Sequence, residues 1–600
     1  MKTNIRFFLL SCIVYANLTE AVAPYYSIRS QSVDLARQVV GVRDIEEDLK
    51  CSECRWPGYI GATVDYTQSF NPKDISHCLF DTGSCQSINV SGSGVANRGA
   101  NDWLADNFGL PINYQSTLNF DPQITNVIAD IQGYIRLDKW SKKCFKKIYL
   151  YVHAPLVYTK WNLHVCEDFK NAGIGYAAGY FAPGAVSASA LSPSASAYLS
   201  GQFAPTIAGV TFNKLANARW AIGDCGSLTK TKFADLRMWL GYDWRNCNRY
   251  DIGFGLVVAA PTGSRPEADY LFEPIVGNGK HWELGFMAKG DFVVWENCDG
   301  THMVTLFTQA NITHLFKAKQ RRTFDLIGKP MSRYMLAEQM GPNTTFLFSN
   351  PVAGSEDPAT TTKPSNQFAG IYTAVANLTT LCVDVSTNVQ VDWVAMATYS
   401  RCNFTWDLGY ELWYRGCEKI TAQCTPLIAE NAWALKGDAF TFGFANETLP
   451  PITQGSAIAL SATESGATIN AGTNNGSGIN TGVDNSQFAL FGQVNTNVGA
   501  VVSVDVIDQQ KTSNNPVFIK SSDIDLCGAR TSGLTNKIFT HFSYYWDCEC
   551  TQPFVGFGGM GEFASKRSNN CSTVCDTNNN CQRCALSQWG VWIKGGFVFG

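Results

Sequence analysis

The strongest pattern along this chain is an alternation of apolar and polar residues with a period of two. It is clear in residues 125–138, 281–295 and 404–415, where one side of each run is apolar and the other carries most of the charges. This period places successive side chains on opposite faces of a β-strand. Each run exceeds the roughly 9–11 residues that a tilted strand needs to cross a bilayer. The pattern therefore predicts membrane-spanning strands with one face toward lipid.

Short and long connections alternate between these runs, which lie at about 57–69, 125–138, 148–163, 233–245, 250–261, 281–295, 302–316, 387–399, 404–416, 537–547, 552–564 and 587–599. The long connections are residues 70–124, 164–232, 262–280, 317–386, 417–536 and 565–586. Tight turns at one end and long loops at the other are typical of bacterial outer-membrane barrels. We expect an all-β fold, a single transmembrane antiparallel β-barrel of about 12 strands (roughly 12–14), with short periplasmic turns and long extracellular loops.

The two ends of the chain fit export to such a membrane. Residues 1–23 have the features of a signal peptide, with Lys2 and Arg6 before a short apolar run and small residues at 21–23. We expect residues 24–56 to form a periplasmic segment with a short amphipathic helix, and residues 57–600 to form the barrel with its loops. The final run ends on the aromatic Phe599, close to the C-terminal aromatic typical of barrel proteins but one place early, because Gly600 follows it.

The composition supports a membrane location and argues against nucleic acid as a partner. Charged residues are 16% of the chain, below the roughly 25% that is usual in soluble domains. Aromatic residues are 12%, and several stand at the ends of the runs, as in the aromatic girdles of barrels. The net charge of -4 is weak and mixed in sign. The expected partner is outer-membrane lipid, the sequence indicates no cofactor, and the oligomeric state stays open.

Charged residues fall on the polar side of the runs, which we interpret as the lumen because a charge facing lipid is costly. They could line a water-filled path for small solutes, or they could pair with one another or with a loop that plugs a narrow lumen. The lumen-lining candidates are Asp130, Arg136, Asp235, Arg237, Glu283, Lys289, Asp291, Asp392, Asp407, Glu411, Arg415 and Lys594.

The chain has 21 cysteines, of which 20 remain once the signal is removed. An even number in an exported chain favours disulfides. One group lies before the first run or in the tight turns, where the cysteines either cross-link a periplasmic rim or simply tolerate turn positions: Cys51, Cys54, Cys144, Cys247, Cys298, Cys402, Cys548 and Cys550. In the long loops we expect Cys166 to bond to Cys225.

A second cysteine group, formed by Cys571, Cys575, Cys581 and Cys584, has a spacing that could hold zinc. Two local disulfides are favoured over a metal on an oxidising cell surface. No metal site is therefore expected. The chain has only seven histidines, and it lacks the short motifs of serine hydrolases and zinc proteases, so no catalytic residue is assigned and no enzymatic activity is expected.

Four stretches resemble a known family, namely ARQVVG from residue 36, NRGANDWLADNFGLP from 97, EPIVGNGKHWELG from 273 and WDLGYELWYRGCEKI from 406. They are similar to the large, cysteine-containing, porin-like outer-membrane barrel proteins of host-dependent bacteria. The resemblance spans most of the mature chain and implies the barrel fold and the outer-membrane location. It implies no catalytic residue.

Two functions follow as hypotheses. The first is a porin-like channel for passive diffusion of small hydrophilic solutes. The second is a surface-exposed structural or adhesion protein, in which disulfide-stabilised loops contact host surface molecules or envelope partners and a plugged barrel serves as the anchor. Whether the long loops leave the lumen open distinguishes the two.

Overall fold

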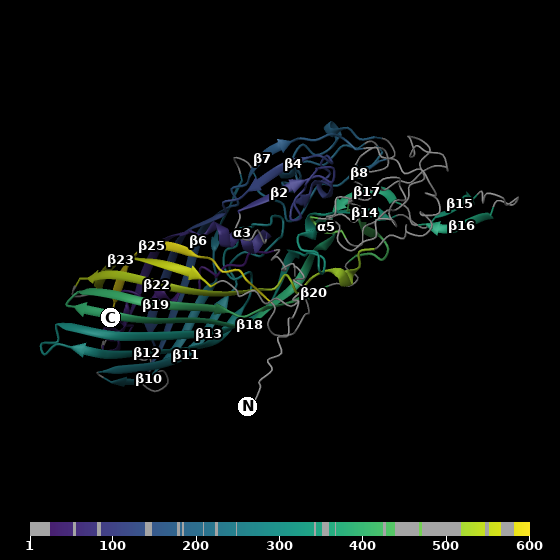
Figure 1. Ribbon diagram of the computed structural model, residues 1–600. Helices are drawn as coiled ribbons and strands as arrows, with labels where there is room; N and C mark the ends of the chain where they lie inside the picture. Colours follow the sequence, from purple (N-terminus) through teal and green to yellow (C-terminus); the bar gives the residue numbers. More distant parts are fainter. Residues whose placement is uncertain are drawn as a thin grey trace, which may run out of the picture.

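The computed structural model describes residues 25–51, 56–80, 86–137, 147–176, 181–182, 185–207, 209–222, 226–247, 249–340, 344–350, 359–365, 368–423, 428–437, 467–470, 518–546, 551–565 and 581–599. The low-complexity stretch 452–482 lies outside the described residues apart from 467–470. Figure 1 shows a barrel with a large folded region at one end and the C-terminus at the other.

Twelve antiparallel strands close the barrel, and the predicted fold class is confirmed. Each strand pairs with its neighbour in the sequence of barrel strands, and β1 pairs with β25 from Gly58 opposite Phe599 to Ser69 opposite Gln588. The strands are β1 (Gly58–Ser69), β5 (Gln123–Arg136), β6 (Ile148–Asn162), β10 (Leu236–Cys247), β11 (Tyr250–Ala260), β12 (Glu283–Glu296), β13 (His302–Thr323), β18 (Thr380–Arg401), β19 (Phe404–Arg415), β22 (Thr531–Tyr545), β23 (Thr551–Ala564) and β25 (Gln588–Phe599).

One short strand extends the wall at its outer half. β9 (Ser227–Phe233) pairs with the second half of β6, while β10 pairs with the first half. Between them the register slips, since Phe233 lies opposite Leu156 and Arg237 lies opposite His153. This irregularity places Asp235, which is fully buried, at the inner surface of the wall.

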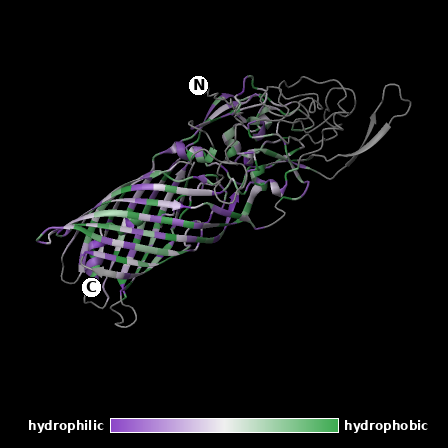
Figure 2. Cartoon of the chain, turned by 60° about the horizontal axis from the view of Figure 1, so that its bottom comes forward, coloured by the Kyte–Doolittle hydropathy of each residue, from purple (hydrophilic) through white to green (hydrophobic). Residues whose placement is uncertain are grey.

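The outer face of the barrel is apolar, as the alternation predicts. Phe286, Ile593 and Phe557 are 71, 63 and 62% exposed, whereas charged residues of the same strands, namely Glu283, Lys594 and Glu562, are buried. Figure 2 shows hydrophobic and hydrophilic residues alternating along the barrel strands. Only a lipid environment makes such a surface stable, because every strand edge is already paired and the side chains outside are apolar. The protein is a transmembrane β-barrel.

The six long loops fold together into a cap at the outer end of the barrel (Figure 1). All six contribute to one apolar core, in which Trp103, Trp220 and Tyr334 lie close together. One cap sheet contains β2 (Ser87–Ser91), β3 (Trp103–Leu104), β4 (Gln115–Asn119) and β7 (Cys166–Asn171); another contains β8 (Thr211–Phe212), β14 (Leu336–Met340), β17 (Phe368–Ala374) and β21 (Trp433–Leu435). The loops are therefore a folded unit rather than separate excursions.

Smaller elements complete the described structure. A hairpin of β15 (Thr344–Asn350) and β16 (Ala359–Ser365) projects from the cap, and β20 (Glu418–Ala422) and β24 (Gln582–Arg583) pair with β18 and β22. The helices are α1 (Leu35–Val39), α2 (Arg43–Cys51), α3 (Pro72–Phe80), α4 (Ala195–Leu199) and α5 (Val375–Thr379), with 3-10 turns at Ala105–Phe108, Ala188–Ala190, Ser332–Tyr334 and Ser521–Asp523. Within the described residues, no helix is long and apolar enough to cross a membrane.

The lipid-facing surface leads to a first prediction. Phe286→Arg should lower the free energy of unfolding in phospholipid vesicles by about 2–4 kcal/mol, the usual cost of an arginine near the bilayer midplane. Phe286 lies on the outer face between Trp282 and Trp295, and a denaturant titration measures the change. Phe169→Arg is the matched control, because Phe169 is 57% exposed but belongs to cap strand β7. Equal losses in the two variants would contradict a lipid-facing position for Phe286.

Candidate functional site

Residues 25–51 pass through the lumen of the barrel, and we call this segment the plug. At the outer end, Tyr26 packs edge-on against Trp161 of β6 and Phe272 of the cap. At the turn end, Lys50 forms an ion pair with Asp251, the second residue of β11. The expected position of residues 24–56 is therefore corrected: the described part of this segment lies inside the barrel and not on its periplasmic side. The periodicity of the sequence predicted a helix in this segment, but it gave no indication that the barrel surrounds that helix.

A guanidinium holds three strands to the plug near its outer end. Arg29 is 3.1 Å from Asp392 on β18 and 3.1 Å from Glu562 on β23, and it also contacts Glu411 on β19. All four side chains are at least nine-tenths buried. Removing one partner from such a buried cluster is costly because the remaining charges are then neither paired nor hydrated.

The first helix of the plug begins beside the same cluster. The Asp34 carboxylate accepts a hydrogen bond from the Arg37 backbone N–H at 3.1 Å, which caps α1. Lys537 of β22 lies 2.9 Å from both Asp34 and Glu411. Burial raises the pKa of Asp34, but the stronger effect of the charges on Lys537, Arg37 and Arg29 holds that pKa well below its usual range. Asp34 therefore stays ionised, and its charge is compensated from both the plug and the wall.

The end of α1 is fixed by two cations. Arg37 lies 3.2 Å from Asp65 on β1 and 3.3 Å from Asp130 on β5. From β25, the Lys594 ammonium donates hydrogen bonds of 3.1, 2.8 and 2.9 Å to the backbone carbonyls of Arg37, Gln38 and Val40. These carbonyls have no partner within the helix, so Lys594 satisfies groups that would otherwise be buried and unpaired.

Gly41 separates the two helices of the plug. Its φ is +68°, a left-handed conformation, and its N–H donates a 2.8 Å hydrogen bond to Asp407. A Cβ at this position would lie 2.7 Å from Nε2 of His541, so both backbone conformation and space require glycine. Beyond this bend, α2 is held by Arg43, which contacts Asp291 and lies 4.2 Å above the Phe307 ring.

The structure buries all twelve predicted lumen-lining residues on the inner face of the barrel. Nine make hydrogen bonds or ion pairs with the plug, namely Asp130, Asp235, Arg237, Asp291, Asp392, Asp407, Glu411, Arg415 and Lys594. The other three pair within the wall: Arg136 and Lys289 with Asp243, and Glu283 with Arg237. These charges therefore hold the plug or pair within the wall, and they do not line an open path.

Sequence reasoning missed the plug side of this network. It predicted a short amphipathic helix in residues 24–56 and assigned no role to Arg29, Arg37 or Arg43. On the wall it also missed Asp65, which shares the buried face of β1 with Thr63 and Thr67. The same period-two test that found Asp130 would have placed Asp65 in the lumen.

Two small cavities lie between the middle of the plug and the wall. Among the described residues, a cavity of about 30 Å³ lies beside Arg29 and one of about 10 Å³ lies beside Gln38. A buried water needs roughly 10–15 Å³ measured in this way. Each of these two cavities can hold at most a few water molecules and is too small for an organic solute.

Two described disulfides staple the long loops, and they differ from the predicted pairings. Cys78 bonds to Cys584 and Cys417 bonds to Cys581, so these bonds span 506 and 164 residues and are not local. Cys166 is a free thiol, which corrects its expected bond to Cys225. Chain spacing did not reveal these partners, because folding of the cap brings distant loops together.

The described residues include only some of the cysteines predicted to form the periplasmic rim. Cys298 and Cys402 are exposed free thiols in the tight turns, so these two positions carry no cross-link. The side chains of the remaining predicted cysteines lie outside the described residues: Cys51, Cys54, Cys144, Cys225, Cys247, Cys548, Cys550, Cys571 and Cys575.

Comparison with known proteins gives structural likeness only. No family model and no curated protein matches the chain. An outer-membrane channel from Pseudomonas putida F1 aligns with 9% identity and a TM-score of 0.26 over 90% of this chain and 96% of that one. A Pseudomonas aeruginosa FadL homologue aligns with 8% identity and a TM-score of 0.25, and the alignment covers 90% of each chain. The Pseudomonas putida toluene transporter TodX aligns with 6% identity and a TM-score of 0.25, and the alignment covers 90% of this chain and 89% of TodX. The barrel assignment rests on the strand order and the lipid-facing surface described above.

The Arg29 cluster leads to a second prediction. Arg29→Leu should lower the free energy of unfolding by about 3–5 kcal/mol, because three buried carboxylates lose their shared cation. Thermal unfolding followed by circular dichroism measures the loss. Arg321→Leu is the control, since Arg321 and Asp269 form an ion pair whose side chains are 41 and 47% exposed. Such exposed pairs contribute about 0–1 kcal/mol, so a similar loss in both variants would contradict the role given to Arg29.

Proposed function

We propose that this protein is an outer-membrane channel for small hydrophilic solutes that is closed at rest by its own N-terminal plug. The observation that carries the proposal is the polarity of the surface between plug and wall. Nine of the predicted lumen charges hold the plug through hydrogen bonds and ion pairs. When the plug leaves, the same charges are exposed in the lumen, where water can hydrate them.

The contrast with the cap supports a plug that moves. A permanent filling needs no buried charges, because well-packed apolar side chains of similar volume are often as stable as buried ion pairs, or more so. The cap follows that rule and has a large apolar core. The plug departs from it, since Arg29, Arg37 and Arg43 all lie in the lumen opposite carboxylates. A charged surface is compatible with water once the two sides separate.

Surface display is the second candidate function. The observation that favours it is the cap itself, which draws all six long loops into one core and is stapled by the Cys78–Cys584 and Cys417–Cys581 disulfides. A rigid cap of this kind can present a constant surface to host or envelope partners, with the plugged barrel as its anchor.

Removal of the plug leads to a third prediction. Full-length protein in a planar bilayer should be silent, and a variant lacking residues 25–51 behind an intact signal should show stable conductance steps. The reason is that deletion leaves the charged wall hydrated instead of paired. Single-channel recording at fixed ionic strength makes the comparison, with insertion of each variant checked by heat-modifiable migration.

A substitution that only loosens the plug tests the same idea in the full-length chain. Lys594→Met removes the donor to three plug carbonyls and should produce brief openings in the full-length chain. Arg321→Met, which changes an exposed pair in the cap region, should stay silent. A correctly inserted deletion variant that never conducts would count against the channel and in favour of the display function.

The display function has its own test. Proteoliposomes carrying the full-length protein should then attach to host cells, and attachment should fall when Cys78 and Cys417 are both changed to serine, because the cap loses two staples. Flow cytometry of labelled vesicles measures attachment. Empty liposomes are the control, and equal attachment of empty and loaded vesicles would exclude an adhesive cap.

A further inference from the structure

A cavity of about 480 Å³ lies at the turn end of the lumen, between helix α2 of the plug and the wall. Its walls come from α2 on one side and from β11, β12, β13 and β18 on the other, and it reaches the turn residues Gly300 and Cys402. Sites for small organic ligands usually have volumes of about 300–1,000 Å³. We call this cavity the vestibule. It is many times larger than the two cavities beside the middle of the plug.

Among the described residues that line the vestibule, carboxylates outnumber basic groups. Its lining includes five carboxylates, those of Asp44, Glu47, Asp48, Asp251 and Asp291. Two arginines, Arg43 and Arg249, also line it, and Lys50 pairs with Glu47 and Asp251. Among these described residues, five carboxylates therefore lie near three basic groups. Burial raises the pKa of Asp44 and of Glu47, although Arg43 acts to lower both.

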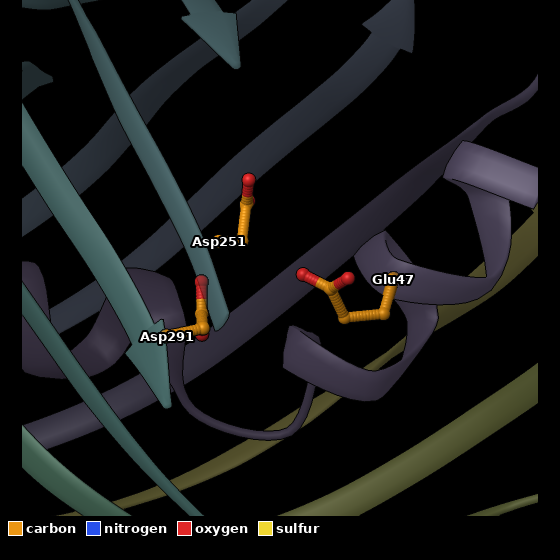
Figure 3. A group of neighbouring side chains, drawn as sticks. All are labelled: Glu47, Asp251 and Asp291. Atoms are coloured by element: carbon orange, nitrogen blue, oxygen red, sulfur yellow. The ribbon is translucent and has the colours of Figure 1, made fainter. Parts of the chain in front are cut away.

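Buried oxygen atoms in the vestibule lack donors among the described residues. Asp251 is 3% exposed, and while one carboxylate oxygen pairs with Lys50, its Oδ1 has no hydrogen-bond partner. Thr305 Oγ1, in the same lining, also has none. A buried acceptor without a donor costs about 1–3 kcal/mol. Figure 3 shows the Asp251, Asp291 and Glu47 side chains converging on one region, and their nearest oxygens lie within 4.8 Å of one another.

Apolar and aromatic side chains also line the vestibule, beside the acidic ones: Phe307 is the cross-strand neighbour of Asp291. Val293, Met303 and Phe307 form this apolar part of the lining, and Arg43 already places its guanidinium 4.2 Å from the Phe307 ring centre. A cation therefore rests on this surface in the closed form. An inorganic divalent cation needs oxygen ligands around most of its surface, whereas part of this lining is apolar. An ammonium group with an apolar body matches both the acceptors and the apolar part of the lining.

We propose that the vestibule is a binding site for small organic ammonium ions. The nitrogen donates to Asp251 Oδ1 and the Glu47 carboxylate, and the apolar body packs against Met303 and Phe307. The site is present in the closed form of the barrel, so it goes beyond the channel function and stands whether or not the barrel conducts.

The test uses phenethylammonium as the probe, titrated calorimetrically into the full-length protein in detergent. Two neutral or negative analogues of similar shape, 2-phenylethanol and 3-phenylpropionate, separate charge from apolar contact. We expect saturable binding of phenethylammonium with one site per chain, about tenfold or more tighter than 2-phenylethanol, as a charge-assisted hydrogen bond predicts. We expect no binding of 3-phenylpropionate. Equal affinity for the amine and the alcohol, or no binding of the amine, would overturn the proposal.

Variants then locate the site. Asp251→Asn should weaken phenethylammonium binding about tenfold, and Met303→Ala should weaken it without changing any charge. Asp299→Asn is the matched control, because Asp299 is an exposed acid in the adjoining turn outside the vestibule lining. Heat-modifiable migration checks that each barrel is folded. Equal losses in Asp251→Asn and Asp299→Asn would place binding elsewhere, and displacement of the probe by CaCl₂ at constant ionic strength would assign the carboxylates to an inorganic cation instead.

Discussion

A charge inside a closed barrel must be either hydrated or paired, and this constraint organises the whole structure. Closing twelve strands satisfies the backbone in lipid but turns the polar face of every strand into a narrow lumen. The inner face of the wall carries positive and negative side chains, and the plug supplies partners for most of them. Arg29, Arg37 and Arg43 of the plug face carboxylates of the wall, and Asp34 and backbone carbonyls of the plug face lysines of the wall. The sequence of residues 25–51 is therefore understandable only as the complement of the wall. The same segment in water would gain little from three arginines spaced in this way.

The wall itself could be predicted from the sequence because a barrel strand has a local signature. Side chains alternate between lipid and lumen, so Asp130 and Glu411 reveal their face through their immediate neighbours. The tight turns follow directly because consecutive strands pair with each other. The predictions were less complete where the strands leave the membrane. β13 continues to Thr323 and β18 begins at Thr380, both well beyond the alternating runs, because these two strands extend into the cap.

The plug, the cap and the disulfides could not be predicted in this way because their partners are distant in the chain. Arg29 meets residues 363, 382 and 533 positions away, and Cys78 meets Cys584 across 506 positions. Helical periodicity in the plug was visible, and the structure does contain helices there, but α1 and α2 are separated at Gly41 because the chain bends beside Asp407 and His541. A local pattern reports which face of a segment is apolar. It carries no information about which wall that face will meet.

The ends of the plug differ in what holds them, and this difference restricts how the proposed channel could open. At the outer end, Tyr26 and Ile28 belong to the apolar core of the cap, so withdrawal from that end would disrupt the cap as well. At the turn end, α2 borders the vestibule, and Glu47 is 43% exposed. The bend at Gly41 lies between these two parts, below the Arg29 and Arg37 pairs. An opening that spares the cap must therefore first break the contacts of α2 with Asp291 and Asp251, which are the contacts nearest to water.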